Sequence, residues 1–261
     1  MNRYTYVIDC NDNRNEYLLK ALLKDGYDIK VYAKNDIYND LKSNYVFIFA
    51  PSAIIDAEMI ANMKDESYIF CLKYDNDIKL LCDKKNIVLY KLFDDEILAM
   101  KNAYLTAEGT LAHIILNTDI SIIGMNILVL GYGRVGKTVS KIMHDNRSNV
   151  SVATKDDKEY AMASIYADNV YKLTELNNKI GNFSVIVNSI PYLILKGDLL
   201  KRISEECFII DLASYPGGID YSEAQKQNLK TFHALGIPGK IAPKTSGEEI
   251  KKSVLKTLFK I

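Results

Sequence analysis

Residues 126–136, with the sequence NILVLGYGRVG, decide the fold class of this chain. NILVL is a short and nearly continuous apolar run, which is typical of a strand that is buried on both faces of a parallel sheet. It leads directly into GYGRVG and then into an amphipathic stretch. A strand, a G-x-G-x-x-G turn and a helix in this order predict a dinucleotide-binding βαβ unit, whereas the glycine pattern alone would be weak evidence.

Each glycine of this turn has its own expected role. Gly131 allows the tight turn, Gly133 lets the backbone approach a pyrophosphate, and Gly136 permits close packing of helix and sheet. The free N–H groups and the dipole at the helix start would hold the anion. The predicted phosphate-binding loop consists of Gly131, Tyr132, Gly133, Arg134, Val135 and Gly136.

The end of the following strand, residues 150–154, bears on the choice of dinucleotide. NAD sites usually place Asp or Glu there, about 20 residues beyond the first glycine, to accept from the ribose 2′-hydroxyl. This chain has Thr154 and Lys155 instead, and the first carboxylate is Asp156. A hydroxyl and a cation suit a 2′-phosphate, so the strand end favours NADP over NAD. Lys155 as a solvated surface lysine and Asp156 as an NAD ligand remain the alternatives.

Two later strands, expected over residues 183–189 and 207–213, end in small polar residues. In doubly wound sheets ligands bind beyond the carboxyl ends of the strands, so these ends are further candidates for cofactor contacts. Asp211 is also a candidate proton acceptor, although an anchoring role for its loop is equally open. The candidates at these two ends are Asn188, Ser189, Ile190 and Pro191, and Asp211, Leu212 and Ala213.

The rest of the chain shows a second α/β pattern before the glycine loop. Short β-branched runs alternate with amphipathic stretches over the first ~90 residues, and a long helix is expected over residues 94–119, with a kink or join at Gly109. We therefore expect a Rossmann-type doubly wound parallel sheet plus a smaller N-terminal α/β domain, as in two-domain dehydrogenases. The expected divisions are an N-terminal domain over 1–100, a connecting helix over 101–122, a dinucleotide-binding domain over 123–240 and a C-terminal helix over 241–261 that packs back toward the N-terminal domain.

A Gly- and Pro-containing stretch, residues 235–245, precedes the last helix. We expect a rigid loop that forms a binding wall, followed by a helix over residues 246–259 with Ser246 as its N-cap. Lys240 and Lys244 in this loop are placed to neutralise a carboxylate substrate, and solvated lysines are the alternative.

The composition is that of an ordinary globular protein. Its 261 residues are 48% apolar and 25% charged, with 33 basic and 33 acidic residues, so nothing global favours nucleic acid or an anionic membrane as a partner. The first ten residues lack the apolar stretch of a signal peptide, and no apolar run is long enough for a membrane span. Four scattered cysteines and three histidines show no metal spacing, which favours reduced thiols in a cytoplasmic protein with no metal site.

Four segments together resemble a known family. The segments NSIPYLIL, IIDLASYPGGIDY and ALGIPGKIAPKTSGE, and TAEGT before the glycine loop, resemble the carboxyl half of the family formed by the A subunits of dipicolinate synthase. The resemblance covers about residues 105–261, and the first ~95 residues match only in pattern.

The resemblance implies an oxidoreductase subunit. The family makes dipicolinic acid in the mother cell during spore formation, together with the flavoprotein-like B subunit of dipicolinate synthase, from dihydrodipicolinate or its hydrated precursor. NADP, or less favourably NAD, would accept the hydride. Ser52 and Thr106 would bind the dicarboxylate beside the two lysines, and Glu108 or Asp211 would accept the proton, with helix capping as the alternative for Glu108.

Three other roles stay open at this point. The chain could bind nucleotide and substrate but act mainly as a partner or chaperone of the B subunit, or it could be a different two-domain dehydrogenase. Assembly with further copies of itself is also open.

Overall fold

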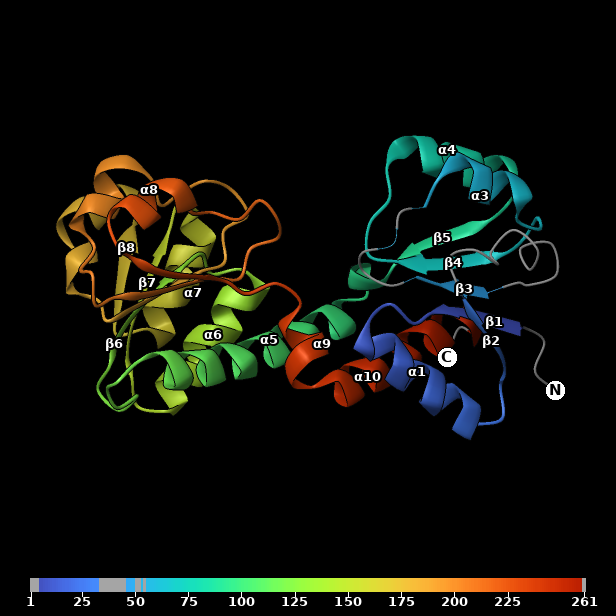
Figure 1. The fold of residues 1–261 in the computed structure, drawn as a ribbon, viewed down its shortest axis with the longest axis horizontal. Coiled ribbons are helices and arrows are strands. Elements are labelled where there is room, and N and C mark those ends of the chain that lie inside the picture. The colour runs from blue at the N-terminus through green and yellow to red at the C-terminus, as the bar shows by residue number, and fades with distance from the viewer. Residues whose placement is uncertain (1–4, 33–45, 50–52, 54, 260–261) are drawn as a thin grey trace. The chain divides into compact units, whose positions relative to one another are not determined.

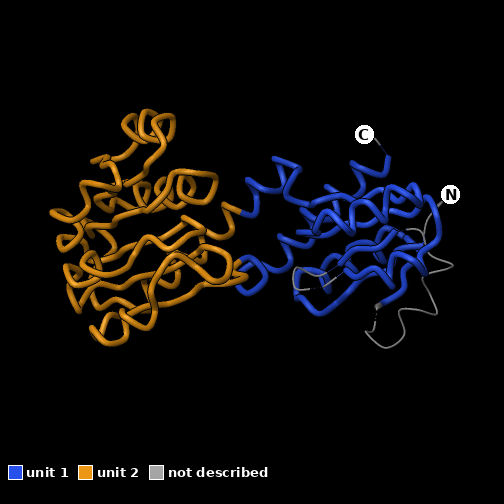
Figure 2. The backbone as a smooth tube through the Cα atoms, turned by 90° about the horizontal axis from the view of Figure 1, so that it is seen from above, with its two compact units in different colours: residues 1–102, 238–261 blue, residues 103–237 orange. Residues whose placement is uncertain are grey.

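The computed structural model describes residues 5–32, 46–49, 53 and 55–259, so Ser52 lies outside the described residues. The chain forms two compact units, which Figure 2 distinguishes by colour. Unit 1 combines Met1–Asn102 with Pro238–Ile261, and unit 2 is Ala103–Ile237. The sequence placed the divisions near residues 100, 122 and 240. In the structure, the long helix is divided at residue 103, so that its second part belongs to unit 2, and the last helix belongs to unit 1.

Unit 1 is built on a five-stranded sheet with the order β2-β1-β3-β4-β5, and all its strand pairs are parallel. The chain order reverses beside β1, which makes the gap between β1 and β3 the topological switch point of this sheet. The strands are β1 (Thr5–Asp9), β2 (Asp28–Tyr32), β3 (Val46–Ile48), β4 (Tyr68–Cys71) and β5 (Val88–Lys91).

Alternating strand residues of unit 1 pack against helices on both faces of the sheet. Phe47 and Ile69 share one buried cluster with the helices α3 and α4, while Ile8 and Phe70 share the other with α1 and α10. Figure 1 shows these helices on either side of the strands. The helical segments are α1 (Asn13–Lys24), α3 (Ala57–Asn62), α4 (Asn76–Lys84), the 3₁₀ turn η1 (Leu92–Asp94), α10 (Pro243–Phe259) and the start of α5 (Glu96–Asn117).

Unit 2 contains a six-stranded parallel sheet with the order β11-β10-β9-β6-β7-β8. Counted from its first strand, this is the 3-2-1-4-5-6 order of the Rossmann fold read from the other edge, with the switch point between β6 and β9. The strands are β6 (Asn126–Leu130), β7 (Asn149–Thr154), β8 (Asn169–Lys172), β9 (Val185–Asn188), β10 (Phe208–Asp211) and β11 (Lys230–His233).

The central strands of unit 2 are buried on both faces, as the apolar run NILVL predicted. Ile127 and Val129 lie in the cluster that contains α5, α6 and α7, and Leu128 and Leu130 lie in the cluster on the opposite face. The fold is therefore a doubly wound α/β fold. The helical segments are α6 (Arg134–Asp145), α7 (Asp157–Tyr166), η2 (Leu173–Asn178), η3 (Ile180–Asn182), η4 (Gly197–Arg202), α8 (Tyr221–Lys226) and α9 (Ile237–Ile241).

Two expectations about local structure were wrong. The predicted loop over residues 235–245 contains α9 and the start of α10, and Ser246 is a buried residue inside α10 rather than its N-cap. Pro243 explains the difference, because proline is well suited to the first helical turn, where its missing N–H is not needed. The join between two helices expected at Gly109 is also absent, since α5 runs from Glu96 to Asn117 without interruption; packing of Ala107 and Ile114 of the same helix in the core outweighs the low helix propensity of glycine.

The cysteines are free thiols. Cys71, Cys82 and Cys207 are buried, and burial raises the pKa of Cys207 to about 12. In the described part of the chain no helix is long and apolar enough to cross a membrane, and no group of His, Cys, Asp and Glu is arranged to hold a metal ion.

Candidate nucleotide-binding site

The glycine loop lies at the switch point of the sheet in unit 2. The loop follows β6, and the strand next to β6 on the other side of the switch point, β9, ends at Asn188. The Ser189 hydroxyl donates to the carbonyl of Leu130 over 2.8 Å. Gly131 has a φ of +86°, and a Cβ there would lie 2.8 Å from the Ser189 oxygen. The loop after β9 thus packs directly on the first glycine and fixes the entry into the turn.

Gly136 and Gly133 serve different purposes. A Cβ at Gly136 would collide with the backbone carbonyl of Gly131, so helix packing alone requires glycine there. Gly133 is exposed, has an ordinary φ of −69°, and a Cβ on it would find only the Glu159 Oε1 atom, at 3.7 Å. No packing contact among the described residues therefore requires a glycine at 133, whereas close approach of a ligand to the backbone would.

The start of α6 fits an anion. Gly133 is its N-cap, no side chain caps the helix, and the first turn contains no acidic residue. A helix N-terminus without its own capping carboxylate leaves N–H groups and the positive end of the dipole for a phosphate. Arg134 and Lys137 add positive charge on exposed positions of the first turn. These residues fit the pyrophosphate of a dinucleotide.

Glu159, in the first turn of α7, was missed by the sequence reasoning. Its Oε2 atom accepts hydrogen bonds from the backbone N–H of Tyr132 over 3.0 Å and from the hydroxyl of Thr154 over 2.6 Å. It therefore brings a negative charge to the glycine loop. The usual signal, a carboxylate at the end of the second strand, could not reveal it, because Glu159 lies five residues beyond Thr154 on a helix.

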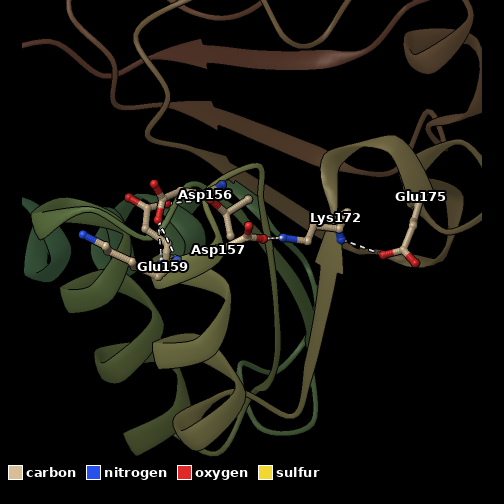
Figure 3. Close-up of polar contacts among 7 residues, drawn as sticks. Asp156, Asp157, Glu159, Lys172 and Glu175 are labelled. Carbon is tan, nitrogen blue, oxygen red and sulfur yellow. Dashed lines mark hydrogen bonds and ion pairs between the residues drawn. The ribbon is translucent and has the colours of Figure 1, made fainter.

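The predicted 2′-phosphate residues have other partners. Thr154 is buried and donates its hydroxyl proton to Glu159, while Lys155 is exposed and lies 4.8 Å from the centre of the Tyr192 ring. Asp156 caps α7 by accepting from the backbone N–H groups of Glu159 and Lys158, and these bonds lower the pKa of its carboxyl. Figure 3 shows Asp156 beside Glu159 at the start of the helix.

The NSIP segment shapes the loop after β9. Asn188 is fully buried; its amide donates to the Ile190 carbonyl and to Asp211, and its oxygen accepts from the Ile190 N–H. Ile190 is buried, whereas Pro191 is exposed. Both the nitrogen and the oxygen of the Asn188 side-chain amide therefore bond to protein atoms. The loop that Asn188 holds in place lies against Gly131.

Asp211 is an anchor at the end of β10. It is fully buried, and its carboxylate accepts four hydrogen bonds: from the Asn188 amide, the N–H groups of Ala213 and Gly218, and the Tyr221 hydroxyl, over 2.7–3.0 Å. Burial and this bond raise the pKa of Tyr221. With both oxygens fully engaged, the geometry favours Asp211 as the residue that joins the loops after β9 and β10, rather than as a free proton acceptor. Leu212, between these contacts, is half-buried.

The two candidates on α5 differ in exposure. Thr106 is buried, and its carbonyl accepts from the Thr110 hydroxyl. Glu108 is exposed and makes no hydrogen bond or ion pair with any residue that the structure describes. The carboxylate of Glu108 is therefore open to solvent and is not held in one orientation by a described neighbour.

Unit 1 contains a buried cation at its own switch point. Arg14 is 6% exposed, and its Nε and Nη2 donate to the two carboxylate oxygens of Asp12 over 2.7 and 2.8 Å. Burial by itself would raise the pKa of Asp12, but the hydrogen bonds and charge of Arg14 outweigh it and lower the pKa. Gly239 of α9 lies against this pair, since a Cβ there would be 3.2 Å from the Arg14 Nε. Lys240 and Lys244 are exposed nearby in sequence.

Comparison with known proteins agrees with this geometry. Residues 102–236, which are just over half of the chain, match the family model of the S-adenosyl-L-homocysteine hydrolase NAD binding domain. The chain belongs to this family. Its NAD-binding-type domain therefore coincides almost completely with unit 2.

The remaining similarities extend beyond unit 2. The A subunit of dipicolinate synthase from Bacillus subtilis is 34% identical over 173 residues, which are 66% of this chain and 58% of that protein. The crystal structure of the same subunit from Bacillus halodurans has a TM-score of 0.87 at 24% identity and covers 98% of both chains. D-lactate dehydrogenase from Escherichia coli has a TM-score of 0.66 at 12% identity and covers 98% of this chain and 97% of that one. The resemblance to the A subunit of dipicolinate synthase is confirmed, and the fold is that of two-domain dehydrogenases.

Proposed function

We propose that this chain is the nucleotide-binding, catalytic subunit of an oxidoreductase that forms dipicolinate. The observation that carries the proposal is the uncapped start of α6 behind the exposed Gly133, in a chain that is 34% identical to the A subunit of a dipicolinate synthase. The substrate would be dihydrodipicolinate or its hydrated precursor, made in sporulating cells. The chain spans only 58% of the length of this curated relative, and we propose the relative's substrate and partners for this chain as well.

The reaction divides between cofactor and protein. Aromatisation of a dihydropyridine removes one hydride and one proton, and a bound nicotinamide supplies the hydride acceptor. The loop 131–136 would hold the pyrophosphate, and the loops after β9 and β10, fixed by Asn188 and Asp211, would form the wall beside the nicotinamide ribose. The strand end favoured NADP through Lys155, whereas the position of Glu159 favours NAD.

Two carboxylates on the substrate require cationic or N–H partners. In unit 1 we assign one of them to Arg14, because Asp12 engages its Nε and Nη2 and leaves Nη1 unbonded by any residue within the described ranges. Lys240 and Lys244 are exposed cations of the same unit and are the next candidates, together with Thr106 in unit 2 and Ser52. Glu108 remains the proposed proton acceptor, since its carboxylate has no described partner.

The hydrogen bonding and exposure of the two candidate bases favour a second role, in which the chain binds ligands but does not complete the active site. Asp211 is saturated with hydrogen bonds and Glu108 is exposed without a described partner, so neither combines a free carboxylate oxygen with a fixed orientation for proton transfer. This observation fits a chain that binds nucleotide and substrate while the B subunit completes the site.

The test is reduction of NAD or NADP by the purified chain, with and without the B subunit. The substrate is generated in place by the condensing enzyme of lysine biosynthesis. Reduced nucleotide formed by this chain alone supports a catalytic subunit. Reduction that requires both chains supports the second role, and absence of reduction under both conditions overturns both.

A further inference from the structure

Glu159 brings a carboxylate to the nucleotide loop from a helix rather than from a strand end. Its Oε2 atom is held by the Tyr132 N–H and the Thr154 hydroxyl. The two donors come from the turn after β6 and from the end of β7, the two segments between which an adenosine ribose lies in a Rossmann domain. The side chain therefore occupies the place at which such domains recognise the ribose.

The other carboxylate oxygen of Glu159 faces the loop. Oε1 lies 3.7 Å from the Cβ position that Gly133 lacks, and no residue in the described ranges donates a hydrogen bond to it. Glu159 is half-buried, and its own backbone N–H is bonded to Asp156 at the helix cap. A fixed carboxylate with one oxygen committed to the protein and one open oxygen beside Gly133 is a ready acceptor for a hydroxyl group.

We propose that Glu159 is a specificity-determining residue, which accepts hydrogen bonds from the adenosine ribose hydroxyls of NAD and excludes the 2′-phosphate of NADP. This inference rests on the proposed function only in that the glycine loop binds a nicotinamide dinucleotide. A carboxylate accepts but cannot donate, so it suits the 2′-hydroxyl and repels a 2′-phosphate. From the sequence, the Thr154 hydroxyl was expected to bind the 2′-phosphate of NADP, but in the structure this hydroxyl already donates a hydrogen bond to Glu159.

Lys155 is the residue that would favour NADP instead, but its surroundings make its charge less effective. Its ammonium group lies over the ring of Tyr192, and the side chain is exposed, so solvent screens its charge. Glu159, in contrast, is fixed by two hydrogen bonds. The fixed negative charge therefore outweighs the screened positive charge at this position, which revises the NADP preference drawn from the strand end.

The experiment titrates the intact chain with NAD and with NADP by calorimetry, for the wild type and three variants. We expect the wild type to bind NAD at least about tenfold more tightly than NADP, and Glu159→Gln to lose about tenfold in NAD affinity while its NADP affinity holds or rises. Glutamine keeps an oxygen for the Tyr132 N–H but removes the charge. Lys155→Ala should change the ratio of the two affinities less than about threefold.

Asp157→Asn is the matched control. Asp157 lies in the same first turn of α7 and carries the same charge, but its carboxylate pairs with Lys172 of β8, as Figure 3 shows. Its loss should leave the NAD-to-NADP ratio unchanged. A wild type that prefers NADP, or a Glu159→Gln variant with an unaltered ratio, overturns the assignment while leaving the proposed function intact. A wild type that binds neither dinucleotide overturns both.

Discussion

The turn after β1 and the turn after β6 occupy corresponding places in two parallel sheets, yet they treat the following helix in opposite ways. Each turn lies at the switch point of its sheet and leads into a helix of 12 residues, α1 or α6. The β1 turn has no glycine, and Asp12 caps α1 by accepting from the Arg14 N–H. The β6 turn has three glycines in six residues, and α6 has no side-chain cap.

This difference shows which of the two sheets is suited to a phosphate. In unit 1 a carboxylate of the protein already occupies the helix start, and any further anion would face Asp12 unless Arg14 compensated for it. In unit 2 no side chain caps the helix start and the first turn contains no acidic residue, while the carboxylate of Glu159 is held at Tyr132, one residue before the N-cap. Topology alone would offer two ligand sites, and the capping residues distinguish them.

The largest effect is expected from a substitution that disrupts the β6 turn itself. Gly136→Ala forces a methyl group onto the carbonyl of Gly131, and because the clashing atoms are backbone the turn itself must shift. We expect unit 2 to lose about 3 kcal/mol of unfolding free energy, at the upper end of overpacking effects. Denaturant unfolding measures this loss. Gly133→Ala is the control, because its methyl group meets no atom within 3.4 Å; equal destabilisation of both variants would contradict the distinction.

The next largest effect is expected on dinucleotide affinity, from a substitution that blocks the anion site but keeps the turn. Gly133→Asp places a carboxylate at the N-cap of α6, as Asp12 already does at α1, so dinucleotide affinity should fall at least about a hundredfold with the fold intact. Calorimetry measures the affinity and circular dichroism the fold. Asn126→Asp adds the same charge at the exposed first residue of β6, at the opposite end of the strand, and keeps the Oδ1 acceptor for the Asn149 amide, so this variant should bind dinucleotide normally. Unchanged affinity in a folded Gly133→Asp chain would count against the site.

The β6 turn could be predicted from the sequence because its signals are local. NILVL marks the strand, three glycines mark the turn, and the confirmed two-domain fold follows from the βαβ pattern around them. Asp211 shows the limit of such reasoning: its position at a strand end was visible, but the four donors that saturate it come from segments up to 23 residues away.

Glu159 and Arg14 were not predicted for the same physical reason. Each lies in the first turn of a helix, where charged residues are usually solvent-exposed, and their burial and partners depend on the packing of other elements. Arg14 is covered by the segment around Gly239, more than 200 residues later in the chain. The helix after Pro243 was placed too late because a Pro- and Gly-rich composition is typical of loops, although proline also suits a first helical turn.

A smaller effect tests whether Arg14 gives the β1 turn its own anion-binding role. Arg14→Lys keeps the charge but loses the planar fork that faces Asp12. If the proposed function holds, we expect the KM for the proposed dicarboxylate substrate to rise about tenfold when the chain is assayed with the B subunit, with kcat and dinucleotide affinity little changed. Steady-state kinetics provides the measurement, and Arg202→Lys, an exposed arginine of unit 2, is the matched control. A lower melting temperature with an unchanged KM would reduce Arg14 to a structural partner of Asp12.

The smallest effect follows the charge that distinguishes the two turns, the Asp12 carboxylate. Its side chain is 21% exposed and paired with Arg14, and the folded state lowers its pKa. A carboxyl group whose pKa is lowered by folding stabilises the protein above its unfolded pKa of about 3.9, and this contribution is lost as the pH falls through the folded value. Asp12→Asn preserves the helix cap but removes the charge, so the variant should be about 1 kcal/mol less stable than the wild type at neutral pH. Denaturant unfolding of both proteins as a function of pH measures the gap, which should shrink as the pH falls below about 4 because the wild-type carboxyl group is then protonated. A difference in unfolding free energy that stays constant across this pH range would mean that the Asp12–Arg14 pair contributes through packing rather than charge. The contrast between the two turns would then depend only on the glycines and on the missing side-chain cap of α6.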